Sequence, residues 1–237
     1  MVRIRKAEDR GPSNLGWLNS KHTFSFGHYY DPEHMGFASL RVLNDDSVIP
    51  GAGFGTHSHE NMEIISYVLS GELAHRDSMG NGSIIRPGDV QRLSAGTGIT
   101  HSEYNHSKTE KVHFLQIWFL PDERDVQPGY EQKVFSDEEK RGRFRLVASK
   151  TGRNNSVSLH RDMDMSVALI NGDETATYTI AANRGLWIHI ARGSVIMNGH
   201  NLKEGDGAAI TDERELKLEK GNHAEVIVFD MGINTSA

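Results

Sequence analysis

Cysteine is absent from all 237 residues of the chain. Its absence excludes disulfide bridges, zinc sites built on thiolates and cysteine nucleophiles. The glycine patterns of serine-hydrolase elbows, P-loops and dinucleotide-binding turns are missing as well. Any metal that this chain binds must therefore be held by histidine and carboxylate side chains.

Long apolar runs and concentrations of basic residues are also missing. The longest apolar stretch, residues 114–120, contains Gln116 and is far too short to cross a bilayer. The charged segment 1–6 has no apolar run behind it, so it does not resemble a secretory signal. With a net charge of −6 and interspersed acids and bases, the chain has no basic face for nucleic acid. We therefore expect a cytoplasmic protein that contacts neither a membrane nor nucleic acid directly.

Glycine, in contrast, is frequent, with 24 residues, and turn signals recur along the chain. Between the turns, apolar residues form short strand-like runs rather than long helical ones. The expected strands cover residues 39–43, 62–70, 71–76, 91–94, 112–119, 187–191, 194–197 and 225–229. Short strands at this spacing are typical of a β-barrel or a β-sandwich. The sequence predicts an all-β protein with little helix.

One short helix is expected at residues 136–141. Ser136 can cap its N-terminus, and Glu139 stands three residues further on, which is the pattern of a capping box. The helix lies in a charged segment that could link two halves of the chain.

An internal repeat indicates two domains. Residues 69–73 lead into the turn at 87–89, and residues 191–195 lead into the turn at 204–206. Both copies have the pattern of strand, glycine turn, strand and Gly-Asp turn. We place the boundary near residue 135, which gives two small β-barrel domains of residues 1–135 and 136–237. The two copies have little sequence identity, so a chance similarity of turn chemistry is the alternative.

Two segments carry side chains that suit a metal ion. His57 and His59 are two residues apart, and so are His101 and Glu103. Side chains two residues apart in a strand point to the same face, so each pair can reach one ion from one side. If both strands face one barrel interior, they supply three nitrogens and one oxygen. A five- or six-coordinate metal held by four ligands keeps open positions, which are typical of a reactive site.

Such pairs arise by chance in a chain with 13 histidines, so their context decides. The first sequence motif of the cupin family is matched by Gly51, His57, His59, Glu63 and Gly71. The match has one extra residue before the last glycine. The second motif is matched by Gly88, Gly96, His101 and Asn105. Here Ser94 replaces the proline of the motif, and two extra residues precede the histidine. The chain therefore resembles the cupins around its histidine pairs.

Within the cupins, the chain resembles the pirin family. The segments that carry this resemblance are GWL (16–18), HTFSF (22–26), YDP (30–32), MGF (35–37), RVLNDD (41–46), GFG (53–55), MEI (62–64), HRDSMGN (75–81), SAGTG (94–98) and EYN (103–105). They cover essentially the whole first half, whereas the second half matches mainly in arrangement. The resemblance implies a bicupin, two barrels of the jelly-roll type, in which only the N-terminal barrel binds metal.

The resemblance also bears on the choice of carboxylate ligand. Typical cupins use the glutamate of the first motif, which is Glu63 here, whereas pirins use the second motif, where Glu103 stands. Strand spacing favours Glu103 as well, because it shares a face with His101. The implied metal ligands are His57, His59, His101 and Glu103, and Glu63 would line the pocket or orient a ligand. We expect structural or surface roles for the other histidines, although His22 and His28 could line the barrel mouth.

The second half offers no matching ligand set. Shifting the metal-binding positions by the offset of the repeat places Thr179, Ala181, Leu218 and Lys220 there. None of these is a usual metal ligand, so we expect a C-terminal barrel without a metal.

Mixed imidazole and carboxylate ligands suit iron(II), nickel, manganese, cobalt, copper or zinc. The resemblance implies iron(II), and some pirins are quercetin 2,3-dioxygenases, which use O2 to cleave a flavonol and release carbon monoxide. In such an enzyme Glu103 would also be catalytic, by taking the proton of the flavonol hydroxyl as a general base. Other pirins are iron-binding regulators that partner transcription factors without turnover, which is the alternative function. A third reading is a metal-binding cupin that acts on a different small molecule.

Overall fold

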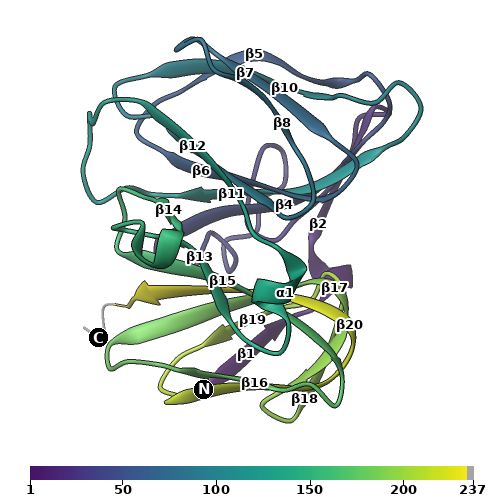
Figure 1. Cartoon of the computed structure of the whole chain (residues 1–237), viewed down its shortest axis with the longest axis vertical. Helices are drawn as coiled ribbons and strands as arrows, with labels where there is room; N and C mark the ends of the chain where they lie inside the picture. Colours follow the sequence, from purple (N-terminus) through teal and green to yellow (C-terminus); the bar gives the residue numbers. More distant parts are fainter. Residues whose placement is uncertain (234–237) are drawn as a thin grey trace. The chain divides into compact units, whose positions relative to one another are not determined.

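The computed structural model describes residues 1–233, which form antiparallel strands joined by turns and one short α-helix (Figure 1). The strands gather into two compact units. We call residues Gly11–Val134 and Val157–Arg161 the N-terminal barrel. We call residues Met1–Arg10, Phe135–Ser156 and 162–233 the C-terminal barrel. The prediction of an all-β fold of two barrels with little helix is confirmed.

The N-terminal barrel is built from two antiparallel sheets. The larger sheet contains, in order across it, β12 (Gly129–Val134), β9 (Asp89–Ser94), β6 (Glu63–Ser70), β11 (Val112–Phe119), β4 (Leu40–Val48), β3 (Leu18–His22) and β2 (Gly11–Asn14). The smaller sheet contains β5 (Gly53–His59), β10 (Ile99–Asn105), β7 (Leu73–Asp77) and β8 (Gly82–Ile85). A short strand, β14 (Val157–Ser158), lies with β9 and β12. Apolar side chains from the facing sheets, such as Val68, Leu73 and Phe114, pack into one core.

The C-terminal barrel has its own sheet and its own core. Its strands run in the order β1 (Val2–Arg5), β19 (Gly207–Ile210), β17 (Arg184–Met197), β20 (Glu215–Gly232), β15 (Met163–Gly172) and β13 (Arg145–Ser149). In addition, β16 (Ala176–Thr179) pairs with β20, and β18 (His200–Lys203) pairs with β17. Short 3-10 turns occupy Ala7–Asp9 and Arg153–Asn155. The core is densely apolar, with Leu186, Ile188 and Val228 all fully buried.

The helix forms where the sequence predicts it. α1 spans Asp137–Lys140, and the Ser136 side chain accepts a hydrogen bond from the backbone N–H of Glu139. The Glu139 carboxylate accepts one from the backbone N–H of Ser136, which completes the capping box. Among residues 1–233, no helix is long and apolar enough to cross a membrane.

The expected break at Gly193 is wrong, because residues 187–191 and 194–197 belong to the single strand β17. Gly193 instead forms part of a bulged region, where the pairing with β20 shifts register. Its φ is +66°, and a Cβ there would lie 2.2 Å from the carbonyl oxygen of Asn222. Glycine is required here by the close approach of two strands rather than by a turn.

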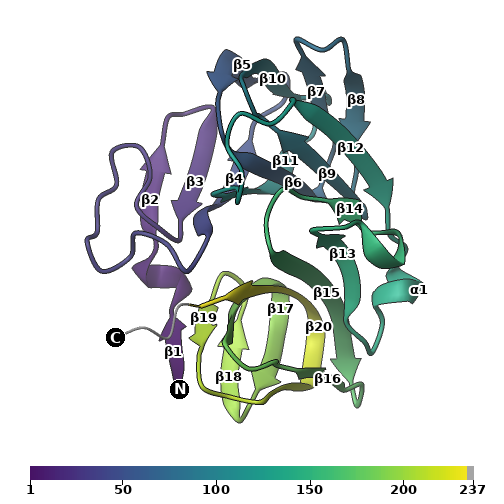
Figure 2. The same ribbon diagram turned by 90° about the vertical axis from the view of Figure 1, so that its left-hand side faces the viewer.

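Two short segments belong to the other barrel than the expected domain ranges of residues 1–135 and 136–237 would assign them to. β1 pairs with β19, from Val2 opposite Ile210 to Arg5 opposite Gly207, so the first ten residues belong to the C-terminal barrel (Figure 2). Val2 and Ile4 pack against its apolar core. Residues Val157–Arg161 belong instead to the N-terminal barrel. The change of unit between Val134 and Phe135 lies where the sequence suggested a boundary.

Candidate metal centre

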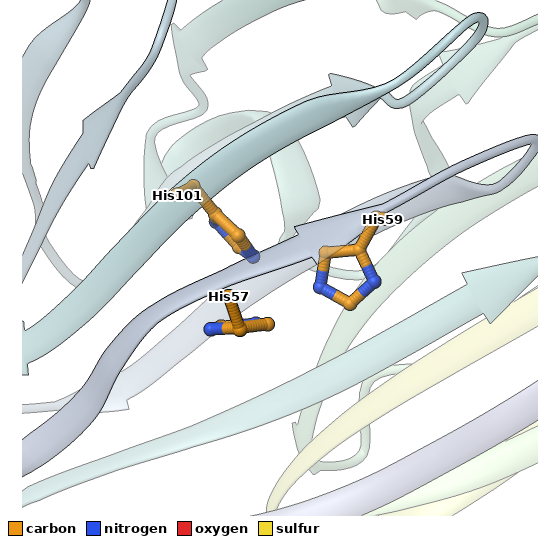
Figure 3. Close-up of side chains that lie close together, drawn as sticks. All are labelled: His57, His59 and His101. Atoms are coloured by element: carbon orange, nitrogen blue, oxygen red, sulfur yellow. The ribbon is translucent and has the colours of Figure 1, made fainter.

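Three imidazoles meet on the smaller sheet of the N-terminal barrel. His57 and His59 lie on β5, and His101 lies on the neighbouring strand β10, directly opposite His57. The ring centroids are 4.5 to 4.9 Å apart, and the rings surround one common space (Figure 3). One ring nitrogen from each histidine lies within 4.8 Å of the others. The strand-face argument from the sequence therefore brings these side chains together as expected, and the three imidazoles can hold one divalent metal ion.

The hydrogen bonds of these rings fit a metal. The Nδ1 atom of His57 lies 2.7 Å from the carbonyl oxygen of Gly55, so this nitrogen donates and leaves Nε2 with a lone pair. The Nε2 atom of His101 is buried and has no hydrogen-bond partner. A buried nitrogen without a partner is costly, and a bound cation would satisfy it.

The environment keeps the imidazoles of His59 and His101 neutral. Burial and, to a smaller extent, the neighbouring imidazoles of His101 and His57 lower the pKa of His59 to about 4. Burial likewise lowers the pKa of His101 to about 3, again with help from His57. Metal binding requires the neutral ring, so near neutral pH these lone pairs are available without loss of a proton.

Glu103 lies beside His101 on β10 and is 1% exposed. Its carboxylate accepts a hydrogen bond of 2.9 Å from the Ser66 hydroxyl and a short one from the Gln116 amide. One carboxylate oxygen lies within 4.8 Å of ring nitrogens of His101 and His75. The position and the donated hydrogen bonds suit a carboxylate ligand at the edge of the histidine cluster.

Glu63, the alternative ligand, points elsewhere. Ser66 faces Glu103, and Glu63 stands three residues earlier on β6, so its side chain is on the opposite face of that strand. Its carboxylate accepts hydrogen bonds from the Ser94 hydroxyl at 2.9 Å and the His160 backbone N–H at 3.2 Å. The expectation that Glu63 lines the pocket or orients a ligand is wrong, because it ties the segment around His160 to the larger sheet.

His75, for which we expected a structural or surface role, is a neighbour of the cluster. It is buried on β7, and its Nδ1 atom lies 3.5 Å from Nδ1 of His101. Its Nε2 atom lies 3.2 Å from the carboxylate of Asp77. Burial alone would raise the pKa of Asp77, but hydrogen bonds from Asn81 and His75 outweigh it and hold the pKa below its usual range.

An ionised Asp77 accepts the Nε2 proton of His75, and this leaves Nδ1 of His75 as an acceptor facing His101. His75 can thus favour the His101 tautomer whose Nε2 is free for a metal. The spacing of His75 and Asp77, two residues apart on one strand face, was the available sequence signal.

A cavity of about 280 Å³ opens beside the cluster. The residues that line it are Leu18, Ser20, His22, Phe26, Asn44, Asp46, Phe54, His57, His59, Glu103, Gln116 and Trp118. Trp118 lies edge-on to the rings of both His59 and Phe26, at 4.9 and 5.4 Å. His22, one of the two histidines that could line the barrel mouth, borders this cavity, and so does Phe26. Apolar walls with a few polar groups are typical of a site for a small flat molecule.

Both candidate metal clusters within residues 1–233 lie in the N-terminal barrel. In the C-terminal barrel, Leu218 is one of the positions that correspond to ligands, and it is fully buried in the apolar core. That barrel interior is filled by side chains.

Comparison with known proteins agrees with this architecture. The sequence model of the Pirin family matches residues 3–119, and the model of the quercetinase C-terminal cupin domain matches residues 146–231. A protein of Escherichia coli K12 named quercetin 2,3-dioxygenase is 46% identical over 231 residues, which cover 98% of this chain and 99% of the relative.

Solved structures show the same relationship. The bacterial pirin YhhW of Escherichia coli, in complex with nickel(II), has a TM-score of 0.94 and 45% identity, covering 99% of this chain and 100% of its own. A quercetin 2,3-dioxygenase of Acinetobacter baumannii shares the fold, with a TM-score of 0.73 at 17% identity over 94% of this chain and 83% of its own. The matched domains and the near-complete coverage at this identity lead to one conclusion: the chain belongs to the pirin family.

Proposed function

We propose that this pirin is a metal-dependent dioxygenase that cleaves flavonols such as quercetin with O2 and releases carbon monoxide. The observation that carries the proposal is the position of His57, His59 and Glu103 on the wall of a largely apolar cavity, with His101 next to them in the three-histidine cluster. The name of the Escherichia coli relative, which aligns along 98% of the chain, supports the same substrate class.

In this proposal His57, His59, His101 and Glu103 hold one metal ion, which we propose to be iron(II). Nickel is a second candidate, since it is bound in the structure of the Escherichia coli pirin YhhW. When bound, a redox-capable divalent ion supplies Lewis acidity toward the flavonol oxygens and reactivity toward O2.

The side chains of the cavity orient the substrate and move its proton. Phe26, Phe54 and Trp118 line the cavity and would hold a flat aromatic ring while they exclude water. Glu103 would take the proton of the hydroxyl that lies next to the carbonyl of the flavonol, as a general base. The hydrogen bonds from Ser66 and Gln116 hold its carboxylate in place for this transfer.

The test is reconstitution. The purified protein is stripped of metal and reloaded in separate samples with iron(II), nickel, manganese, cobalt, copper or zinc, and bound metal per chain is measured. Quercetin loss, O2 consumption and carbon monoxide release are then followed together. We expect one carbon monoxide per O2 consumed in the iron(II) sample and none in the His57→Ala variant loaded in the same way.

Stoichiometric metal binding without turnover in every sample would refute the dioxygenase proposal. That outcome would favour the regulatory alternative, an iron-binding protein whose partner is another protein.

A further inference from the structure

Asp46 is a second buried carboxyl group in the cavity, and it comes from the other sheet. Inward-facing residues alternate along two paired strands of the larger sheet, Ser20 and His22 on β3 and Asn44 and Asp46 on β4. Ser20 lies opposite Asp46, and His22 lies opposite Asn44. These four residues form a polar patch, which we call the β3–β4 patch. It faces a cavity whose metal-binding side chains come from β5 and β10.

Most of the β3–β4 patch is satisfied by internal hydrogen bonds. The Nδ1 atom of His22 lies 2.8 Å from the amide oxygen of Asn44 and 3.3 Å from the Ser20 hydroxyl. The Ser20 hydroxyl also hydrogen-bonds to the Asp46 carboxyl group. The Oδ1 atom of Asp46 is different, because it is buried and has no hydrogen-bond partner, and Asp46 is only 2% exposed. A buried polar atom left unpaired is costly, and the space in front of this one is a ligand cavity.

The charges around Asp46 allow it to act as donor or acceptor. Burial raises its pKa to about 7, and although the Ser20 hydroxyl opposes the shift, the negative charges of Asp45 and Glu103 add to it. Its carboxyl group therefore carries a proton part of the time near neutral pH. Such a group matches a hydroxyl, which also both donates and accepts.

Gln116 relates the positions of the two carboxyl groups of the cavity. Its amide donates to Glu103, and on β11 it pairs with Asn44, which is two residues before Asp46 on β4. A flat ligand that reaches Glu103 with one hydroxyl can therefore extend toward Asp46 with its other end.

We propose that Asp46 is a specificity-determining residue that hydrogen-bonds a second hydroxyl of a polyhydroxylated aromatic substrate, away from the hydroxyl that reaches the metal-binding side chains. The inference rests on the proposed function for the class of substrate. It adds that the site selects for hydroxyl groups on the part of the molecule that is not cleaved. A site that pairs a buried polar group with a ligand hydroxyl discriminates against the analogue that lacks it, because the group then stays unpaired.

The experiment crosses two ligands with two variants. Quercetin is compared with 3-hydroxyflavone, which keeps the hydroxyl and carbonyl of the reacting ring but lacks the other hydroxyls. Dissociation constants are measured anaerobically on metal-loaded protein by quenching of tryptophan fluorescence, since Trp118 lines the cavity. Asp46→Leu removes the carboxyl group at nearly constant volume. Asp45→Leu is the matched control, because Asp45 is the adjacent residue on β4 and pairs outside the cavity with His113 at 2.6 Å.

We expect the wild-type protein to prefer quercetin by at least about tenfold, the value of one well-formed hydrogen bond in a buried site. Asp46→Leu should reduce this preference to about threefold or less, and Asp45→Leu should retain it. A merely structural role of Asp46 would weaken both ligands alike and leave their ratio unchanged, which would overturn the proposal.

Equal affinity of the wild-type protein for the two ligands would also overturn it, and that comparison needs no variant. Because binding is measured without O2, a failure of turnover refutes the proposed function while the ligand preference still decides the role of Asp46.

Discussion

Glutamine substitutions of Glu63 and Glu103, made one at a time, should have different effects: the change at Glu63 should lower stability, and the change at Glu103 should weaken metal binding. Glu63 accepts hydrogen bonds from Ser94 and from the backbone N–H of His160, and its carboxylate lies 3.3 Å from Nδ1 of His160. An amide keeps one acceptor oxygen but turns the other into a donor, so at least one hydrogen bond to a buried charge is lost. Such a bond contributes about 2 kcal/mol. For a protein of this size, that loss corresponds to a fall in Tm of about 4–8 °C.

Glu103→Gln should have the opposite profile. Changes to residues that only support a metal ligand cost about 10- to 100-fold in affinity, so removing the carboxylate ligand should cost at least about 100-fold. Its fold should persist, since Ser66 and Gln116 can both hydrogen-bond to an amide.

The assay combines metal content after anaerobic loading with iron(II) and thermal unfolding of the metal-free proteins. We expect Glu63→Gln to bind about one metal per chain with a lowered Tm, and Glu103→Gln to be nearly metal-free with a Tm close to that of the wild type. Loss of metal from Glu63→Gln together with full loading of Glu103→Gln would show that the carboxylate of the first cupin motif is the ligand, and would refute the argument from strand faces.

Three further predictions concern the surroundings of the cluster. His75→Phe should weaken metal binding about 10- to 100-fold by removing the acceptor that faces Nδ1 of His101, and a dissociation constant equal to that of the wild type would contradict this role. The metal-free protein should lose stability as pH falls from 6.5 toward 4. In the unfolded chain His59 and His101 take up protons near pH 6.5, whereas in the fold their pKa values are near 4 and 3, so protons favour the unfolded state. Urea unfolding at several pH values measures this loss, and a free energy of unfolding that does not change with pH would exclude it. Gly96→Ala should destabilise the fold by more than about 1 kcal/mol, because a Cβ would lie 1.9 Å from the carbonyl oxygen of Val126 at a φ of +48°, and an unchanged Tm would show that the chain relaxes there.

The fold was predictable where one residue pattern determines the local structure. The strand at Val112–Phe119 has the expected bounds because an apolar run lies between polar segments. Strand β5 was harder to delimit, since Gly53 and Gly55 resemble a flexible lead into the His57 strand. In the structure the strand begins at Gly53, where a Cβ would lie 2.3 Å from the carbonyl oxygen of Glu103. The glycine is required by the close approach of β10, which the local sequence does not reveal.

The site was predictable only in part for a related reason. The pairs of metal-binding side chains follow from the two-residue period of a strand, which is local. The orientation of Glu63 depends on which face of β6 turns toward the cavity, and that is determined by its pairing with β11 and β9. His75 becomes a neighbour of the cluster through the pairing of β7 with β10, which joins residues distant in the sequence. Asp46 lies on the larger sheet and faces the same cavity as the cluster only when the two sheets close into a barrel.

The pairing of β1 with β19 has a consequence for the order in which the chain can fold during synthesis. β1 is synthesised about two hundred residues before its partner β19, so the C-terminal barrel completes only after β19 has been made. The N-terminal barrel contains no residue beyond Arg161, so it can fold and bind a metal while the C-terminal barrel is still incomplete. During that interval β1 has no partner strand, so a tag or fusion placed before β1 would be present while the pairing of β1 with β19 forms, and it could compete with this step of folding.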